Sequence, residues 1–486
     1  MVDFYDDKPH DECGVFGYFC KDTNAHLAAY AYSALFALQH RGQESCGICV
    51  SNDGVMTVRK ELGLVSEVFT PRDIAELGEG NMVVGHVRYS TTGASKAMNA
   101  QPIIVHHKKG SMAIAHNGNL TNANELRDEF ESDGGIFHTT SDTEVIAYAI
   151  TRARLTVGAI EDAVAEAMKK IKGAYSVVVM SPRKMIAARD PYGLRPLCMG
   201  RHGDDVVFAS ESCALGAVGA TFVRDLEPGE IVVVTPKGIS SINTFTGGKK
   251  RMCVFEYVYI ARPDSVIDGE SVHIARKRAG AYLAKTHPVD ADVVIGSPDS
   301  GLDAALGYAE ASGIPYGVGI TKNRYVARTF IQPTQEMRQR SITLKLSALK
   351  ATIEGKRVIL VDDSIVRGNT MRQVVSMLRL AGSSEIHLRI SSPPFKHPCY
   401  FGIDVDTREN LIANQMTVEE IAEYLGVDSL GYLSIEDVRR IAEVENSDFC
   451  VGCFSGDYPC EPPTDSGKRK FERKLSERGA EKETKD

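Results

Sequence analysis

The stretch VILVDDSIVRGNT, residues 358–370, constrains the fold of this chain more than any other part of the sequence. Its apolar, mostly β-branched beginning predicts a buried strand, which is followed by two adjacent carboxylates and a short hydroxyl-rich turn that opens a helix near Asn369. Backbone N–H groups at the beginning of a helix bind anions. The pattern therefore predicts a strand of a parallel sheet whose carboxyl end carries a phosphate-binding turn.

The side chains of this turn predict the kind of ligand that it binds. Two adjacent carboxylates would repel a phosphate, so they are expected to face hydroxyl groups or a cation on the same ligand, while hydroxyl, amide and glycine positions suit the phosphate. A sugar phosphate meets both demands. The simpler alternative is an ordinary buried strand with a polar turn. The candidate binding residues are Asp362, Asp363, Ser364, Gly368, Asn369 and Thr370.

Length, charge and cysteine usage limit the class of protein. A chain of 486 residues is too long for one hydrophobic core, so we expect two domains. A net charge of −8 argues against nucleic acid as the main partner, and no apolar run approaches the roughly 18 residues of a membrane span. The acidic N-terminus is unlike a signal peptide, so we expect a cytoplasmic location. In that reducing compartment, those of the 11 cysteines that cluster are expected to be metal ligands or nucleophiles.

The chain changes character once, near the polar stretch Ser240–Lys250. Residues 13–245 contain short alternating strands, which predicts an α+β domain of packed β-sheets flanked by helices. Residues 246–462 alternate strands with helices, which predicts an α/β domain with a doubly wound parallel sheet. The expected strands are 175–180, 205–210, 230–235, 292–295, 357–362 and 385–390, and the expected helices are 159–172, 270–285, 301–311, 369–381, 418–425 and 435–444.

The two ends of the chain differ from the rest. Residues 463–486 mix charges of both signs with almost no apolar residue, so we expect a disordered tail. Residues 1–12 form an acidic leader without apolar periodicity, and we expect a propeptide that is removed before Cys13. Removal would give Cys13 a free α-amino group, whose ordinary pKa of about 7.7 to 8.0 suits a general base for the thiol. A buried structural cysteine is the alternative.

Five segments, DECGVFG, HRGQES, GHVRYST, HNGNL and SDTE, occur in this order between residues 11 and 144. Together they resemble the glutamine amidotransferases of the N-terminal-nucleophile type. The resemblance implies that Cys13 is the nucleophile and that Asn117 and the Gly118 N–H form an oxyanion hole. It also implies that Arg88 pairs with the α-carboxylate of glutamine and Asp142 with its α-ammonium. His86 and His116 are interpreted as structural.

The second half resembles the type I phosphoribosyltransferases, and the two halves together resemble the glutamine phosphoribosylpyrophosphate amidotransferases. The resemblance implies that Asp362 and Asp363 face the ribose diol and one Mg²⁺ per subunit, and that residues 364–370, including Arg367, hold the 5′-phosphate. The segment Pro298-Asp299-Ser300-Gly301 resembles the diphosphate loop, in which Asp299 binds substrate and Ser300 also approaches the metal. Asn369 stands where this family usually has threonine.

A basic segment resembles the flexible loop that closes over the substrate in this family. A bare basic stretch is otherwise typical of a solvated surface. The residues concerned are Lys322, Asn323, Arg324, Tyr325, Arg328, Arg338, Arg340 and Lys345.

Four cysteines have the pattern of a metal site. Cys450 and Cys453 have C-x-x-C spacing, and Cys253 and Cys399 lie in segments that resemble the cluster-bearing branch of the family. Spacing alone allows zinc or iron, whereas the resemblance implies one [4Fe-4S] cluster per subunit. A second C-x-x-C, Cys46 to Cys49, enters an apolar strand and is interpreted as buried packing. Cys20, Cys198, Cys213 and Cys460 receive no role.

The resemblance implies an enzyme that transfers the amide nitrogen of glutamine to 5-phosphoribosyl 1-diphosphate, giving 5-phosphoribosylamine, glutamate and diphosphate. This would be the committing step of purine synthesis, in a homotetramer inhibited by purine nucleotides. Two alternatives predict different sequences. An amidotransferase that makes asparagine or an amino sugar would have another second half, and a DNA-binding regulator would need a basic helix-turn-helix module. The stretch 358–370 and the Cys13 segments argue against both.

Overall fold

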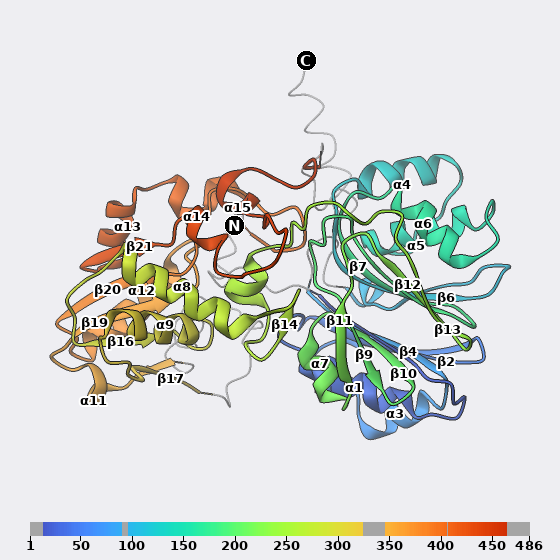
Figure 1. The fold of residues 1–486 in the computed structure, drawn as a ribbon, viewed down its shortest axis with the longest axis horizontal. Helices are drawn as coiled ribbons and strands as arrows, with labels where there is room; N and C mark the ends of the chain where they lie inside the picture. Colours follow the sequence, from blue (N-terminus) through green and yellow to red (C-terminus); the bar gives the residue numbers. More distant parts are fainter. Residues whose placement is uncertain (1–12, 90–95, 324–345, 406, 464–486) are drawn as a thin grey trace, which may run out of the picture.

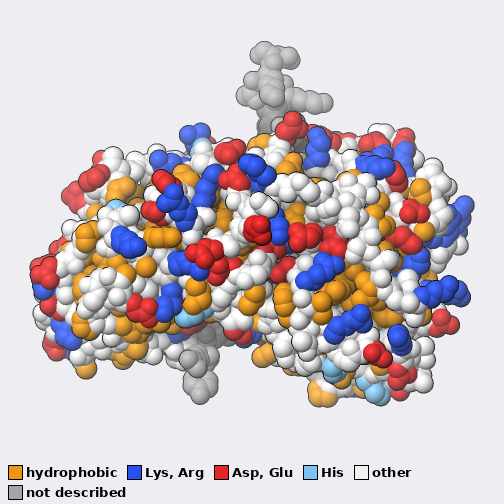
Figure 2. Space-filling model, in the orientation of Figure 1, with side chains coloured by type: hydrophobic (Ala, Val, Ile, Leu, Met, Phe, Trp, Pro, Cys, Tyr) orange, Lys and Arg blue, Asp and Glu red, His pale blue; other side chains and the backbone are white. Residues whose placement is uncertain are grey.

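The computed structural model describes residues 13–89, 96–323, 346–405 and 407–463. Figure 1 shows two lobes side by side, with the residues up to β13 in one and the later helices and parallel strands in the other. Among the described residues, no helix is both long and apolar enough to cross a membrane. Acidic and basic side chains are interspersed over the face seen in Figure 2.

The first lobe is a sandwich of two antiparallel sheets with helices on both outer faces (Figure 1). The seven-stranded sheet has the order β11 (Thr221–Asp225), β9 (Cys198–His202), β10 (Asp205–Ala209), β1 (Gly14–Phe19), β4 (Met82–Arg88), β2 (Ser45–Asn52) and β3 (Val55–Leu62). The six-stranded sheet has the order β13 (Gly238–Ile242), β12 (Ile231–Thr235), β8 (Met185–Arg189), β7 (Gly173–Met180), β6 (Met112–Leu120) and β5 (Ile103–Val105).

Side chains on alternate faces of the strands form three apolar layers in this lobe. In β1, Val15 and Phe19 pack between the two sheets, whereas Phe16 and Tyr18 pack with the helices on the outer face, because successive side chains of a strand point to opposite faces. The helices beside the seven-stranded sheet are α1 (Leu27–Ala37), α2 (Val65–Val68), α3 (Pro71–Glu76) and α7 (Ser212–Ala217). Those beside the other sheet are α4 (Ala123–Ser132), α5 (Asp142–Ala153) and α6 (Ile160–Met168).

The second lobe is built on a four-stranded parallel sheet with the order β16 (Val293–Gly296), β19 (Arg357–Asp362), β20 (Glu385–Ile390) and β21 (Ser429–Tyr432). Ile359 and Val361 pack with α8 (Val272–Thr286) and α9 (Leu302–Ser312). Val358 and Leu360 pack on the opposite face with α12 (Asn369–Leu380) and α13 (Val418–Leu425). Helices therefore cover both faces, which confirms the predicted doubly wound sheet.

Short elements complete the second lobe. They are the π-helix η2 (Glu256–Ile260), the hairpins β14 (Val266–Ile267) with β15 (Glu270–Ser271) and β17 (Ile320–Lys322) with β18 (Leu346–Ala348), the one-turn helices α11 (Lys350–Ile353), α14 (Ile435–Val438) and α15 (Gly452–Ser455), and the 3₁₀ turns Arg408–Asn410 and Ile412–Asn414; the first lobe has one such turn, Ala97–Asn99.

Two predicted helices are shorter in the structure. The helix expected over 159–172 ends at Met168, because the backbone of Lys172 pairs with Thr121 and with the Asn122 side chain, and Gly173 begins β7. The helix expected over 435–444 ends at Val438, because the Ile441 carbonyl accepts from Arg278 and the Glu443 N–H donates to Glu270. Contacts across the fold replace helical hydrogen bonds in both segments. The polar stretch 240–250 also differs, since its first residues belong to β13.

Candidate functional site

The predicted nucleophile lies at the beginning of β1, beside the end of β4. Gly14 pairs with Val87 in the antiparallel register, which places Cys13 next to Arg88. Both side chains are buried, and the Cys13 thiol lies 3.5 Å from the Tyr89 carbonyl oxygen. A side chain on Gly42 would collide with the backbone of Arg88, so the HRG turn packs tightly against this strand end.

The predicted oxyanion residues lie on β6, in the other sheet. Asn117 is completely buried, and neither atom of its side-chain amide has a hydrogen-bond partner among the described residues. Gly118 has φ of +136°, and a side chain there would come within 2.1 Å of the Ala174 carbonyl oxygen, so glycine is required. A buried unpaired amide is costly, which makes Asn117 suited to donate to a bound ligand.

Asp142 lies in the first turn of α5, where a carboxylate is favoured by the helix dipole. Its carboxylate accepts from the Leu120 N–H at 2.9 Å and lies 3.7 Å from Nδ1 of His116. Burial would raise the pKa of Asp142, but the neighbouring His116 and the Leu120 hydrogen bond outweigh it and lower the pKa below its ordinary value. The group is therefore ionised, as the binding of an ammonium requires.

The two predicted structural histidines lie beneath this site. Nε2 of His86 donates to the His116 carbonyl oxygen at 2.9 Å, and burial lowers the pKa of His86 to about 3. His116 contacts Thr143 and the Ala174 carbonyl.

The acceptor residues lie at the carboxyl ends of the parallel strands. Asp362 ends β19, and its backbone carbonyl accepts from Ser391, which follows β20. Both carboxylates of the pair Asp362 and Asp363 are buried. Asp363 accepts from Ser300 at 2.5 Å and also from Ser364. The predicted diacid and the predicted diphosphate loop are thus in direct contact.

The predicted phosphate turn leads into α12. Gly368 precedes the helix with φ of +88°, and a side chain there would meet Ile412 at 2.9 Å. Arg367, Asn369 and Thr370 are partly exposed around the first turn of the helix. The Tyr424 hydroxyl donates to the Asn369 side chain at 3.2 Å. Asn369, which stands where the family usually has threonine, is therefore also held by a contact within the protein.

The diphosphate segment joins β16 to α9. A side chain on Gly301 would come within 2.3 Å of the Val361 carbonyl oxygen, which explains the glycine after Ser300. Asp299 is exposed and pairs with Lys322 at 2.5 Å. Of the predicted flexible loop, Lys322 and Asn323 are described, while Arg324, Tyr325, Arg328, Arg338, Arg340 and Lys345 lie outside the described residues.

The four predicted ligand cysteines come together in one buried cluster of the second lobe. Cys253 forms a parallel β-bridge with Cys450. The one-turn helix α15 begins two residues later and contains Cys453. Burial raises the pKa of Cys450 to about 12, and burial together with the other three cysteines raises that of Cys453. The Phe401 N–H donates to the Cys399 sulfur at 3.4 Å.

No group of three or more histidine, cysteine or acidic side chains within the described ranges is arranged to hold a single metal ion. The cysteines of the second C-x-x-C, Cys46 and Cys49, lie in β2 and pack on opposite faces of its sheet. Burial raises the pKa of each to about 12. A pair that points to opposite faces cannot share one ion.

Buried charged residues support the Cys13 site, namely Arg41 of the HRGQES segment and three residues outside the five segments, Arg195, Glu211 and Glu256. Arg41 donates to the Cys13 carbonyl at 3.0 Å, and its guanidinium pairs with Glu211 and Glu256. Glu256 also contacts Arg195 at 3.4 Å. Arg195 follows the turn Asp190–Gly193. No periodicity signals that these side chains meet.

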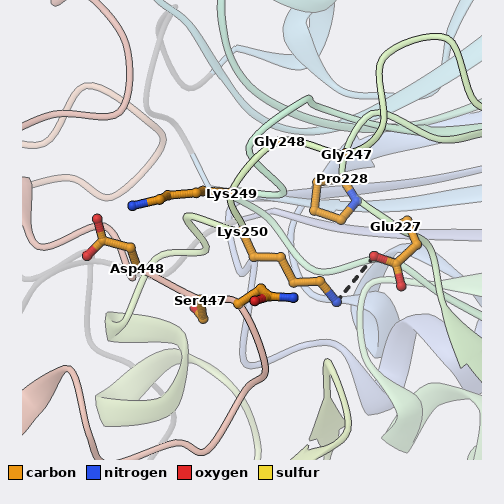
Figure 3. Close-up of a pocket in the computed structure, with 9 residues that line it drawn as sticks. Glu227, Pro228, Gly247, Gly248, Lys249, Lys250, Ser447 and Asp448 are labelled. Atoms are coloured by element: carbon orange, nitrogen blue, oxygen red, sulfur yellow. Dashed lines mark ion pairs between the residues drawn. The ribbon is translucent and has the colours of Figure 1, made fainter.

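A separate pocket of about 530 Å³ lies at the seam of the two lobes, formed by Glu227 and Pro228, residues 247–250 and residues 446–448. Figure 3 shows Glu227 and Lys250 paired in it, at 3.2 Å. It contains none of the predicted site residues.

Comparisons with known proteins identify both halves. Residues 86–217 match the model of the glutamine amidotransferase domain, and residues 271–392 match that of the phosphoribosyl transferase domain. The amidophosphoribosyltransferase of Bacillus subtilis (strain 168) is 46% identical over 457 residues, covering 93% of this chain and 95% of that protein. The amidophosphoribosyltransferase of Synechocystis sp. is 48% identical over 463 residues, covering 94% of this chain and 92% of that protein.

Two solved structures have the same fold over nearly the whole chain. The glutamine phosphoribosylpyrophosphate amidotransferase of B. subtilis, complexed with ADP and GMP, matches with a TM-score of 0.86 and 46% identity, covering 93% of this chain and 98% of that one. A structure described as the allosteric regulatory enzyme of purine biosynthesis matches with a TM-score of 0.87 and 46% identity, covering 93% and 97%.

Proposed function

This chain belongs to the amidophosphoribosyltransferase family, and from that premise we propose which of its residues carry each half of the reaction. The enzyme transfers the amide nitrogen of glutamine to 5-phosphoribosyl 1-diphosphate, giving 5-phosphoribosylamine, glutamate and diphosphate, which commits phosphoribosyl groups to purine synthesis. The observation that carries the assignment of the glutaminase centre is the buried side-chain amide of Asn117, which has no hydrogen-bond partner within the described ranges and lies on β6, the strand that packs against β1.

Cys13 is the nucleophile of the first half-reaction. Removal of residues 1–12, which lie outside the described residues, frees its α-amino group to take the thiol proton. The thiolate attacks the glutamine amide carbon, while Asn117 and the Gly118 N–H stabilise the developing oxyanion. The proton passes to the departing ammonia, and water hydrolyses the resulting thioester to glutamate.

Arg88 and Asp142 hold the other end of glutamine. Arg88 at the end of β4 pairs with the α-carboxylate, and the ionised Asp142 pairs with the α-ammonium. These contacts leave the side-chain amide of glutamine directed at Cys13. Free glutamine would lose much of its motion in this position, which lowers the barrier to attack.

The second half-reaction takes place at the carboxyl end of the parallel sheet. The segment that leads into α12, with Ser364 and Arg367, and the first turn of the helix, with Asn369 and Thr370, bind the 5′-phosphate. Asp362 and Asp363 bind the ribose hydroxyls, and Asp299 and Ser300 lie at the diphosphate. Ammonia then attacks C1 of the ribose as diphosphate leaves. Because ammonia is protonated in water, it must pass between the sites without meeting solvent.

One Mg²⁺ ion suits this second site. Hard oxygen groups of Asp362, Asp363 and Ser300 would hold it, and Mg²⁺ commonly binds one or two carboxylates together with substrate phosphates rather than a complete protein cage. The lack of a three-ligand group among the described residues is compatible with that mode of binding. The ion would neutralise charge on the departing diphosphate.

One [4Fe-4S] cluster suits the four cysteines. Cys253, Cys399, Cys450 and Cys453 would hold it, and thiolates on a multi-iron cluster stand farther apart than ligands of a single ion. Thiols buried this deeply are neutral without a metal, and the cluster would compensate the charge of four thiolates. The Phe401 N–H beside the Cys399 sulfur is the kind of hydrogen bond that tunes such clusters.

Regulation, assembly and location complete the proposal. Purine nucleotides act as feedback inhibitors, which is supported by the ADP and GMP bound to the related B. subtilis enzyme. The enzyme acts as a homotetramer in the cytoplasm, without nucleic acid or membrane partners. The acidic net charge of −8 supports the exclusion of nucleic acid.

A reciprocal pair of measurements tests the glutaminase assignment. Cys13→Ala should reduce glutamine-dependent synthesis by about a thousandfold or more, because the nucleophile is removed, while synthesis from ammonium salts stays within about twofold. Intact mass should show that the active wild-type protein begins at Cys13. Equal loss of both activities, or full activity in protein that retains residues 1–12, would contradict the assignment.

A further inference from the structure

The glutaminase centre is held from beneath by two completely buried residues, one from each lobe. Arg195 follows β8 in the first lobe, and Glu256 begins the π-helix η2 in the second. Their side chains are 3.4 Å apart. Neither residue is among those assigned to bind glutamine, and their other contacts connect them to Cys13 and to the strand that carries Asn117 and Gly118.

One set of contacts leads to the nucleophile. Glu256 accepts two hydrogen bonds from Arg41, at 2.8 and 3.0 Å, and the Nε of Arg41 donates to the Cys13 carbonyl at 3.0 Å. Burial would raise the pKa of Glu256, but Arg41 and Arg195 outweigh it and lower the pKa. The carboxylate is therefore ionised and orients the guanidinium that holds Cys13.

The other set of contacts leads to the oxyanion hole. Arg195 donates from Nε and Nη2 to the Phe401 carbonyl, at 3.0 and 2.8 Å. The next residue, Gly402, has φ of +126°, and a side chain built on it would lie 3.5 Å from the Gly118 Cα. Asn119 binds the Tyr400 carbonyl at 2.9 Å. Segment 400–402 of the second lobe thus packs directly under the strand that carries Asn117 and Gly118.

We propose that Arg195 and Glu256 are positioning residues for the glutaminase reaction. They fix the positions of Cys13 and of β6, the strand that carries Asn117 and Gly118, relative to the second lobe. The inference rests on the proposed assignment of Cys13, Asn117 and Gly118. The pair makes the first lobe competent for attack only when the second lobe is docked beneath it. Glutamine binding through Arg88 and Asp142 does not depend on the pair.

The test variant is Glu256→Gln, measured in the full-length enzyme. It keeps the shape of the side chain but removes the charge that orients Arg41. Glutamine-dependent kcat should fall about tenfold to a hundredfold, since small misplacements of reacting groups cost this much, while KM for glutamine changes less than about threefold. Synthesis from ammonium salts should stay within about twofold, which also shows that the variant is folded.

The matched control is Glu230→Gln. Glu230 is likewise buried and paired with an arginine, Arg224, but it contacts no residue of the glutaminase centre. We expect it to retain wild-type kcat with glutamine. Arg195→Lys is the second variant. It keeps the charge but loses the pair of hydrogen bonds to the Phe401 carbonyl, and it should show the same decrease in kcat.

The outcomes separate this inference from the site assignment. If Cys13→Ala retains glutamine-dependent synthesis, the assignment of the centre is wrong. If Cys13→Ala is inactive but Glu256→Gln and Arg195→Lys behave as Glu230→Gln does, only the positioning role is wrong. Parallel loss of glutamine-dependent and ammonia-dependent activity in both variants, or a defect confined to KM, would likewise overturn it.

Discussion

The two reactive sites of this enzyme are assembled in opposite ways. The acceptor site is local, because one continuous stretch, residues 358–370, supplies most of its groups and the neighbouring segment, residues 297–301, lies directly against it. The glutaminase site is distributed over strand ends of two sheets and is supported by Glu256 and Phe401 of the other lobe. The comparison predicts that acceptor chemistry depends on residues of the second lobe, whereas glutaminase chemistry depends on residues of both lobes.

The largest effect is expected at the local site. Asp362→Ala should lower ribosylamine formation by about a thousandfold with either glutamine or ammonium salts, because a charge interaction worth several kcal/mol at the transition state is removed. Glutamine hydrolysis should persist, since Asp362 ends β19 in the second lobe, whereas Cys13 lies at the beginning of β1 in the first. Product formation and glutamate release are measured on the same preparation. Loss of both activities together would mean that the sites do not separate as the comparison predicts.

The local site could be predicted in detail from the sequence. β19 and α12 begin or end within one residue of their predicted bounds, because the apolar run, the diacid and the glycine before the helix all act over a few residues. Ser364 adds a contact that the sequence pattern does not reveal, since its hydroxyl donates to Asp363.

The distributed site could be predicted only through its motifs. The motifs named Cys13, Arg88 and Asp142, and their structural arrangement is compatible with the predicted roles. They did not reveal that Arg195 meets Glu256, because the two are separated by 61 positions and no local pattern links them. The helix predicted over 435–444 failed for the same reason, since contacts of Ile441 and Glu443 with α8 and its preceding strand replace helical hydrogen bonds.

The two C-x-x-C pairs offer a second comparison at identical spacing. In β2, Cys46 and Cys49 point to opposite faces of the sheet. Cys450 and Cys453 lie at the turn into α15, in the same buried cluster as Cys253 and Cys399 of two other segments. Strand geometry separates the first pair, and the turn into α15 keeps the second together. Spacing therefore predicts ligation only where the backbone leaves the strand conformation.

An intermediate effect is expected when this second comparison is tested. Cys450→Ser should give colourless, poorly soluble protein, because metal binding is part of the folding free energy of such a site. The matched control Cys46→Ser should keep the iron content of the wild type. Iron analysis and absorption spectra of protein prepared without oxygen decide the matter. Zinc in the wild type, or full iron in Cys450→Ser, would contradict the [4Fe-4S] proposal.

The smallest effect is expected at a partly buried acidic pair where the lobes meet. Asp225 ends β11 in the first lobe, and Asp268 lies in the turn between β14 and β15 of the second. Arg189 pairs with Asp268 at 2.7 Å. Burial and the neighbouring Asp268 raise the pKa of Asp225, against the opposing effect of Arg189 and of backbone N–H groups. The carboxyl is thus more easily protonated in the folded protein than in the unfolded chain.

The sign of the pH dependence follows from this raised pKa. Where the unfolded chain has lost the proton, above its ordinary pKa of about 3.9, the folded protein still holds it. The stability that Asp225 contributes is therefore greatest below that pH and is lost as the pH rises through the raised value. Asp225→Asn removes this dependence. Between pH 5 and pH 8, the variant should lose about 2–4 °C less of its Tm than the wild type does.

Thermal unfolding at both pH values measures this difference, with Asp204→Asn as the control. Asp204 is exposed, lies in the same lobe and belongs to the loop between β9 and β10, so its replacement should leave the pH profile of Tm unchanged. If Asp225→Asn shows the same profile as the control, Asp225 is ionised at neutral pH, because Arg189 and the backbone N–H groups of Asp268 and Gly269 offset the cost of its burial. The pH dependence of stability would then not arise at this junction of the lobes.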